Sequence, residues 1–288
     1  MKTKIIVLLL IFLTNPLLSS DSLAILKYDP KLGLDMKGLI NQPSKPIKII
    51  ETQIEKIKKI AQNFPIEDVL ENDIVIMETS VGKLKLKLFP EIAPEHCKNF
   101  KRLANSGFYD GTTFHRVIQG FMIQGGDILS RDFDPENDGT GSPGWTVPAE
   151  FNKTPHKRGI LSMARASDPN SAGSQFFICV EDTPHLDEKY TVFGEVISNF
   201  HVIDRIAKTP TGYSIANLSA KDSIPKGEDL NKWVTLTDPK SKKEIYSKIP
   251  LNMNKNAYRN QQQKFLYSDR PLNDVLIKKI RVKPIEQK

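Results

Sequence analysis

The sequence contains only two cysteines, Cys97 and Cys179. One pair is too few for a fold held by a disulfide framework, so we expect stability to come from an apolar core. Cys179 lies within the apolar run from Phe176 to Val180, which is typical of a small buried thiol. His96 precedes Cys97, but no further ligand stands at metal-binding spacing, and we predict no metal site. The sequence alone does not decide whether the two thiols pair, because pairing depends on geometry.

Motifs that mark several common enzyme chemistries are also absent. The chain has no Gly-x-Ser-x-Gly elbow, no phosphate-binding P-loop, no His-Glu-x-x-His helix and no CxxC pair. The glycines from Gly120 to Gly126 are interrupted by larger residues and precede no helical pattern, so they do not form a dinucleotide-binding loop. We therefore expect no covalent, nucleotide or metal chemistry and no cofactor.

Positive charge is in excess, but it is not concentrated in one basic stripe. The chain has 288 residues, of which 39% are hydrophobic and 26% charged, a composition typical of globular proteins. Its formal net charge is +7, and the lysines are spread along the whole length. Aromatic residues do not alternate with basic ones as they do in surfaces that follow a phosphate backbone. We expect a solvated basic surface and no nucleic-acid partner.

The N-terminus carries the pattern of a secretory signal. Lys2 and Lys4 precede an apolar run from Ile5 to Leu13, which is followed by Pro16 and the small residues Ser19 and Ser20. This order predicts a signal peptide over residues 1–20. The run is shorter than the roughly 20 residues that span a bilayer, although an uncleaved signal acting as an anchor stays open. We expect a protein exported to the periplasm or another extracytoplasmic space, with membrane association only through such an uncleaved signal.

Residues 21–71 form a proline-containing extension with one amphipathic stretch. Ile50, Ile54, Ile57 and Ala61 recur there at helical spacing, which predicts one helix. The apolar stripe of this helix would dock either on the main domain or on a partner. We favour the main domain, because amphipathic helices usually bury their stripe against their own fold.

The pattern from residue 72 onward predicts short strands and few helices. The run DIVIMETSVGKLKLKLF alternates with period two on both sides of a Ser-Val-Gly turn, which predicts a β-hairpin. A helix is expected to begin near Ala93-Pro94-Glu95 and to end near Asn105-Ser106-Gly107. Further apolar runs, separated by Gly, Pro, Asn and Asp, indicate an all-β barrel or sandwich.

A lysine- and asparagine-rich segment interrupts this domain before its last strand. We interpret residues 213–268 as an insertion, residues 72–283 as the domain that contains it, and residues 284–288 as a tail. The last strand is expected over 274–282, where apolar and polar residues alternate again.

Five ordered blocks of sequence carry the strongest signal. They are FHRVIQGFMIQGGD (114–127), GILSMA (159–164), GSQFFI (173–178), LDEKYTVFGEV (186–196) and IKKI (277–280). These blocks closely resemble the signature segments of cyclophilins, over roughly residues 72–212 and 269–283. The resemblance implies a mainly-β fold, namely a closed eight-stranded antiparallel barrel capped by two helices, with a proline-binding pocket on its outer face. It also implies peptidyl-prolyl cis/trans isomerase activity.

The residue types suit that activity. Rotation about a peptide bond meets a barrier of ~18–20 kcal/mol, because resonance gives the C–N bond double-bond character. A catalyst that binds the twisted amide more tightly than the planar forms lowers this barrier without breaking a bond. The prolyl nitrogen regains a lone pair in the twisted state, so a fixed hydrogen-bond donor aimed at it accelerates rotation. Arg116 offers such a donor, since its guanidinium is planar and always charged.

The resemblance implies roles for other residues around Arg116. Phe121 and Gln124 complete the catalytic set, with Gln124 holding Arg116. We favour a structural role for His115 over a role as general acid or base, because the reaction transfers no proton. The residues expected to contact substrate are His115, Met122, Ala164, Arg165, Gln175, Phe177, His185, Leu186 and Tyr190.

Three positions depart from the best-known eukaryotic cyclophilins. His185 stands where they have a tryptophan, Tyr190 where they have a pocket histidine, and Arg165 where they have an asparagine. One extra residue also stands near Asp168. This pattern resembles the bacterial branch. Loss of the indole N–H and of its apolar face implies weak cyclosporin binding.

Two functions follow from these observations. The first is a monomeric folding enzyme that acts on proline-containing unfolded or exported polypeptides. The alternative is a scaffold or chaperone that binds proline segments, with the extension and the insertion as docking surfaces and with incidental or no catalysis. The complete set of Arg116, Phe121, Gln124 and Phe177 favours the enzyme, whereas the insertion keeps the alternative open.

Overall fold

The computed structural model describes residues 47–131, 136–213, 220–239, 241–251 and 253–285. The expected signal at 1–20, the extension up to residue 46 and the last three residues of the tail lie outside the described parts. Among the helices that are described, none has the length and apolar character needed to cross a membrane.

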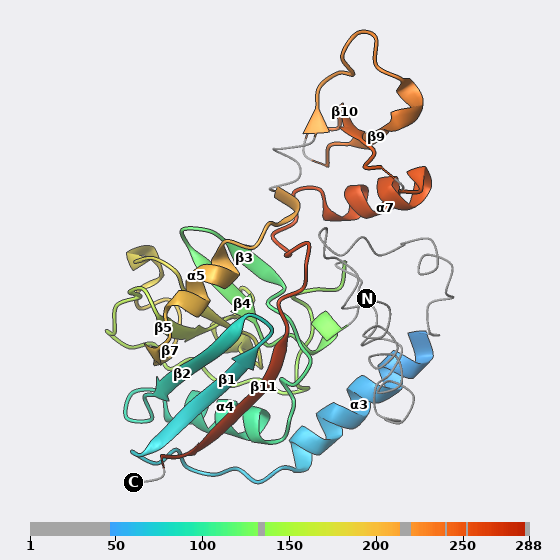
Figure 1. Cartoon of the computed structure of the whole chain (residues 1–288). Coiled ribbons are helices and arrows are strands. Elements are labelled where there is room, and N and C mark those ends of the chain that lie inside the picture. Colours follow the sequence, from blue (N-terminus) through green and yellow to red (C-terminus); the bar gives the residue numbers. More distant parts are fainter. Residues whose placement is uncertain (1–46, 132–135, 214–219, 240, 252, 286–288) are drawn as a thin grey trace, which may run out of the picture.

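An eight-stranded antiparallel sheet forms the main body of the chain (Figure 1). Its strands are β1 (Asp73–Thr79), β2 (Gly82–Leu88), β3 (Arg116–Ile118), β4 (Met122–Gly125), β5 (Ile160–Met163), β6 (Phe176–Cys179), β7 (Val192–Ser198) and β11 (Ile277–Pro284). They are ordered β11-β1-β2-β7-β5-β6-β4-β3. The predicted hairpin is confirmed, since Val75 of β1 pairs with Leu86 of β2 and alternate residues of both strands are buried.

The edge strands of this sheet are β3 and β11, and the segment that leads into β3, together with β3 itself, is hydrogen-bonded to the segment that precedes β11. The Phe114 amide donates to the Val275 carbonyl at 3.0 Å, and the Val117 amide donates to the Asp269 carbonyl at 2.8 Å. An isolated bridge joins Thr113 to Leu276. Residues 113–117 therefore run beside residues 269–276, and the chain around Asp269 is fixed next to β3.

Two helices pack on the sheet (Figure 1). Helix α4 spans Pro94–Asn105, with Pro94 at its first position, and so begins and ends where the sequence predicts. Its Phe100 lies 5.6 Å from Phe176 in an edge-to-face contact at the centre of the core. Helix α5 spans His201–Ala207 and buries its apolar residues against the same core.

Helix α3 spans Ile47–Asn63 and precedes the sheet. Ile54 and Ala61 are buried in the same apolar cluster as the sheet and α4, and Ile57 packs against it. Arg102 of α4 donates from Nε to the Ala61 carbonyl at 2.9 Å. The side chain of Ile50, the fourth residue of the predicted stripe, lies outside the described part.

The insertion folds into a small lobe that projects from the sheet (Figure 1). We use "lobe" for residues 220–268 in their described parts. Its elements are β8 (Ala220–Lys221), β9 (Trp233–Thr237), β10 (Glu244–Lys248) and α7 (Lys255–Phe265). The strands form a separate sheet in the order β8-β10-β9. A separate core gathers Val234, Leu236, Ile245, Tyr258 and Leu266.

Two chain segments join the lobe to the main sheet, and we call residues 210–213 and 268–272 the stalk. The Leu272 amide donates to the Pro210 carbonyl at 2.9 Å, and Thr211 forms an isolated β-bridge with Pro271.

Four single-turn 3-10 helices occur in the described residues, at Ile128–Arg131, Pro169–Ser171, Pro184–Leu186 and Leu230–Lys232.

Candidate active site

A second apolar cluster, separate from the main core, lies over strands β4, β5 and β6. Successive residues of a strand point to opposite faces of a sheet. On β6, Phe176 accordingly joins the main core while Phe177 joins the second cluster. The cluster consists of the buried residues Met122, Ile160, Phe177, Cys179, Leu186 and Val192, bordered by Phe89, Ile118, Phe121, Ala164 and Tyr190. We call it the apolar floor. It brings together six apolar and aromatic residues that the sequence predicts for the catalytic set or for substrate contact, namely Phe121, Met122, Ala164, Phe177, Leu186 and Tyr190.

A row of polar side chains borders this floor. Arg116 of β3 pairs in register with Gln124 of β4, which pairs in turn with Phe177 of β6. Arg116 donates from Nη1 to Gln124 Oε1 at 3.4 Å, and Gln124 donates from Nε2 to Gln175 Oε1 at 3.0 Å. Gln175 donates onward to the carbonyl of Gly139 at 2.9 Å. The predicted contact between Gln124 and Arg116 is therefore present, and Gln175 links the row to the loop around Gly139.

Arg116 has a second partner that sequence reasoning missed. Its Nε donates to Asp269 Oδ2 at 3.1 Å. Asp269 lies 153 positions away in the sequence, beyond the insertion. Only the pairing of residues 113–117 with residues 269–276 brings the two side chains together, and no local motif marks Asp269.

His115 is buried, and neither of its ring nitrogens has a hydrogen-bond partner among the described residues. Burial lowers its pKa to about 4, with the nearby Asp127 carboxylate opposing this effect and Arg270 and Arg116 adding to it. His115 as a whole residue is 4% exposed, whereas the side chain of the neighbouring Arg116 is 46% exposed. This burial favours the structural role over a direct contact with substrate.

Aromatic and basic side chains border the other end of the floor. Phe121 stacks on His185 with ring centres 5.5 Å apart, and Phe177 meets Tyr190 edge-on at 5.8 Å. The Arg165 guanidinium carbon lies 4.6 Å from the centre of the Tyr190 ring. The three positions that depart from eukaryotic cyclophilins therefore lie at this end of the site.

His156 supports the floor from behind. Its ring is parallel to that of Phe177 to within 13°, at 6.0 Å. Its Nδ1 lies 2.9 Å from Asp187 Oδ1, and its Nε2 lies 3.0 Å from Ser162 Oγ. The order Ser-His-Asp matches that of a hydrolytic triad, but both His156 and Ser162 are buried, so the serine cannot meet a substrate. We assign the arrangement to holding Phe177 and Leu186 in place.

Both cysteines are free and buried. Burial raises the pKa of Cys97 to about 12 and that of Cys179 to about 11. Within the described ranges, no group of three or more histidine, cysteine or acidic side chains is arranged to hold a metal ion.

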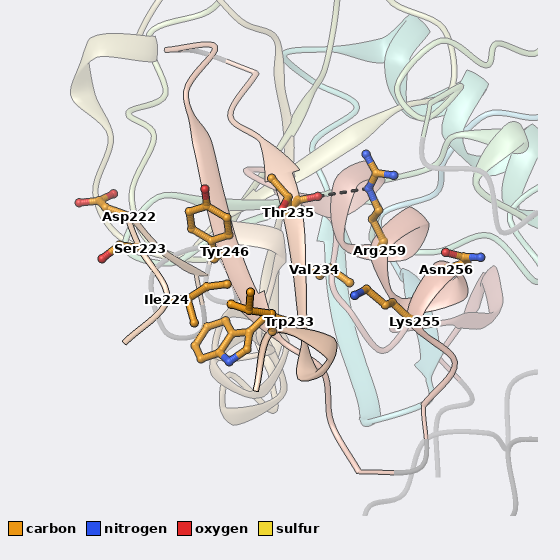
Figure 2. A pocket seen from close by; sticks show the side chains of 11 residues that line it. Asp222, Ser223, Ile224, Trp233, Val234, Thr235, Tyr246, Lys255, Asn256 and Arg259 are labelled. Carbon is orange, nitrogen blue, oxygen red and sulfur yellow. Dashed lines mark hydrogen bonds between the residues drawn. The ribbon is translucent and has the colours of Figure 1, made fainter. Parts of the chain in front are cut away.

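A hollow of about 710 Å³ lies in the lobe, away from the apolar floor (Figure 2). It is bounded by Trp233 and Tyr246 of the small sheet and by Lys255 and Arg259 of α7. Arg259 donates from Nε to the Thr235 carbonyl at 3.2 Å across one side of it. None of the residues predicted for the proline pocket lines this hollow.

A family model for cyclophilin type peptidyl-prolyl cis-trans isomerases matches residues 74–226, more than half of the chain. The chain belongs to this family. The family and the isomerase activity predicted from the sequence are thereby confirmed. The matched range contains Arg116 and every residue of the apolar floor, and it ends inside the lobe.

Relatives from several bacteria carry the same description. A probable peptidyl-prolyl cis-trans isomerase of Brucella suis is 45% identical over 139 residues, which cover 46% of this cyclophilin and 71% of the relative. A peptidyl-prolyl cis-trans isomerase of Helicobacter pylori is 41% identical over 165 residues, which cover 56% and 89%. Peptidyl-prolyl cis-trans isomerase B of Bacillus subtilis is 50% identical over 119 residues, which cover 41% and 78%.

Solved structures agree with the fold. A crystal structure of a Cryptosporidium parvum cyclophilin type isomerase, obtained in the presence of the dipeptide Ala-Pro, matches with a TM-score of 0.50 and 29% identity. The match covers 74% of this chain and 99% of that one. The mainly-β cyclophilin fold with an eight-stranded sheet is thereby confirmed.

Proposed function

We propose that this isomerase accelerates X–Pro rotation by holding the twisted amide between Arg116 and the apolar floor. The observation that carries the proposal is the position of Arg116, which pairs across β3 and β4 with Gln124 beside a floor containing Phe177. The proline ring would rest on Phe121, Met122 and Phe177, where apolar burial fixes its orientation. The preceding residues would lie in the groove bordered by Ala164 and Gln175.

The guanidinium of Arg116 can then act on the prolyl nitrogen. Its Nε is bound to Asp269 and its Nη1 to Gln124, while Nη2 has no hydrogen bond among the described residues. A donor at Nη2 gains its partner only when the amide twists and the nitrogen lone pair forms. Such an interaction stabilises the transition state more than the ground state and so raises kcat.

We further propose that the substrates are proline-containing segments of unfolded, exported polypeptides. The signal pattern in residues 1–20 supports export to the periplasm or another extracytoplasmic space. The Ala-Pro dipeptide present with the Cryptosporidium parvum relative supports a small X–Pro unit as the ligand. The proposed enzyme is a monomer that needs no cofactor.

Two finer features of the fold belong to the same proposal. The hydrogen bonds of residues 113–117 with residues 269–276 support a barrel that is closed between β3 and β11. Burial of Ile54 and Ala61 in the main core supports docking of α3 on its own domain rather than on a partner.

The lobe supports a second candidate function, a docking surface for clients. Residues 213–268 hold ten basic and five acidic residues, a net charge of +5, and the lobe has its own core. A surface of this charge favours acidic polypeptides. On this view the lobe increases activity on protein clients and leaves activity on short peptides unchanged.

Mapping of peptide binding separates the two candidates. An NMR titration with a short Ala-Pro peptide is expected to shift the resonances of Phe177, Met122 and Tyr190 and to leave those of Trp233 and Tyr246 unchanged. Shifts confined to the lobe residues would contradict the proposed site and favour the scaffold.

A further inference from the structure

Arg116 has a long and partly exposed side chain that needs restraint to act as a fixed donor. Its side chain is 46% exposed, so solvent leaves several rotamers open to it. Of its two partners, Gln124 lies at 3.4 Å, beyond the usual range for an N–H···O bond. Asp269 lies at 3.1 Å, within that range, and its bond is charge-assisted. Asp269 is therefore the stronger restraint on the guanidinium.

Asp269 is itself held firmly. Its carbonyl accepts the Val117 amide at 2.8 Å, which fixes its backbone beside β3. The next residue, Arg270, is buried and forms a 2.8 Å ion pair with Asp138 and a 3.2 Å ion pair with Asp274. A buried, paired arginine directly after Asp269 leaves little freedom for the carboxylate to move away from Arg116.

Asp269 and Arg270 connect the stalk to both ends of the polar row that borders the apolar floor. Asp269 contacts Arg116 at one end of this row. Arg270 forms an ion pair with Asp138, which directly precedes Gly139. The Gly139 carbonyl accepts a hydrogen bond from the side chain of Gln175 at the other end of the row. The stalk thus contacts both Arg116 and the loop around Gly139.

We infer that Asp269 is a positioning residue for Arg116, and that the stalk below the lobe is part of the isomerase site. Asp269 binds Nε and so restrains the plane of the guanidinium, while Nη2 has no hydrogen bond among the described residues. This inference rests on the proposed role of Arg116. Asp269 is an additional partner of Arg116, and it reaches the site because the chain returns from the lobe to the main sheet at residue 269.

The test is the kinetics of X–Pro isomerisation by full-length Asp269→Ala. We expect kcat to fall about five- to twentyfold, the range of a lost charge-assisted bond and a misplaced donor, with KM changed less than twofold. Asp269→Asn keeps the acceptor without the charge and should retain an intermediate kcat. The matched control is Asp204→Ala, which removes another arginine partner, at 2.8 Å from Arg158, and should leave kcat unchanged.

A second arm separates positioning from a general structural effect. Lysine lacks the planar guanidinium that Asp269 orients. Asp269→Ala introduced into an Arg116→Lys variant should therefore lower kcat by less than a further twofold. The inference would be overturned if the kcat of Asp269→Ala lay within twofold of the parent, or if Asp269→Ala lowered kcat equally in the parent and in Arg116→Lys. If Asp269→Ala does not fold, Asp269→Asn carries the same comparison. Full activity of Arg116→Ala would instead overturn the proposed role of Arg116, so failure of that role can be distinguished from failure of the role of Asp269.

Discussion

His185 occupies the end of the apolar floor, where its ring stacks on Phe121 at 5.5 Å. An indole at this position adds apolar area and an N–H donor. We therefore predict that His185→Trp strengthens cyclosporin binding about tenfold, a change of about 1.4 kcal/mol. Calorimetric titration of the parent and the variant with cyclosporin measures this change in affinity. His201→Trp, which places the same side chain on α5, is the control. Equal affinity of parent and variant would contradict the assignment of His185 to the pocket edge.

The two thiols, Cys97 and Cys179, are both buried and free. Cys97 donates to the Phe193 carbonyl, and burial raises the pKa of Cys97 to about 12 and of Cys179 to about 11. Thiolate is the reactive form, so both should resist alkylation while the protein is folded. Titration with a thiol reagent should detect no reactive thiol in the native protein and two reactive thiols after denaturation. Rapid labelling of the native protein would contradict this burial.

Single residues of the pocket could be predicted because they lie in short contiguous blocks. Met122 and Gln124 share one such block with Arg116, and alternation along β6 separates Phe177 from Phe176. Asp269 could not be predicted in this way. Its contact with Arg116 depends on how the chain returns to the sheet after the lobe, which no local period encodes.

At the scale of elements, the stalk depends on a close approach at Gly212. A Cβ built on Gly212 would lie 1.6 Å from the Phe265 carbonyl oxygen, so any side chain forces the end of α7 away. We predict that Gly212→Ala loosens the lobe while the main sheet stays folded. Hydrogen exchange should rise in described residues of 220–268 and stay unchanged in β1 and β2. Unchanged exchange in the lobe would contradict the packing at the stalk.

Elements with strong local signals could be predicted, and those without could not. The β1–β2 hairpin and α4 follow from period-two alternation and from a proline at the helix start. The lobe is rich in lysine and asparagine, which favour no single element. Its small sheet depends instead on a core that gathers Val234, Ile245 and Tyr258 from separate segments.

At the scale of the whole molecule, buried histidines make stability depend on pH. Burial is the largest cause that lowers the pKa of His96, His115 and His156, that of His115 to about 4. In the unfolded chain these rings take up a proton below about pH 6.5, whereas the folded protein resists it. The unfolded state then binds more protons, so the free energy of unfolding falls as the pH drops from about 6.5 towards 4.

Urea unfolding at pH 7.5 and pH 5 measures this effect. The midpoint should be lower at pH 5, and the difference should be smaller in His115→Gln, which cannot take up the proton. An equal difference in parent and variant would contradict the role of His115 in acid sensitivity.

The role of Arg116 is tested most directly by the cis-to-trans conversion of a short X–Pro peptide at low temperature, with the parent and Arg116→Ala compared. We expect the parent to accelerate the conversion and Arg116→Ala to lose about a hundredfold or more in kcat/KM, as for removal of one transition-state donor. Arg205→Ala, whose side chain binds the Val81 carbonyl, is the matched control and should match the parent. A folded Arg116→Ala variant with the activity of the parent would show that this guanidinium does not stabilise the twisted amide.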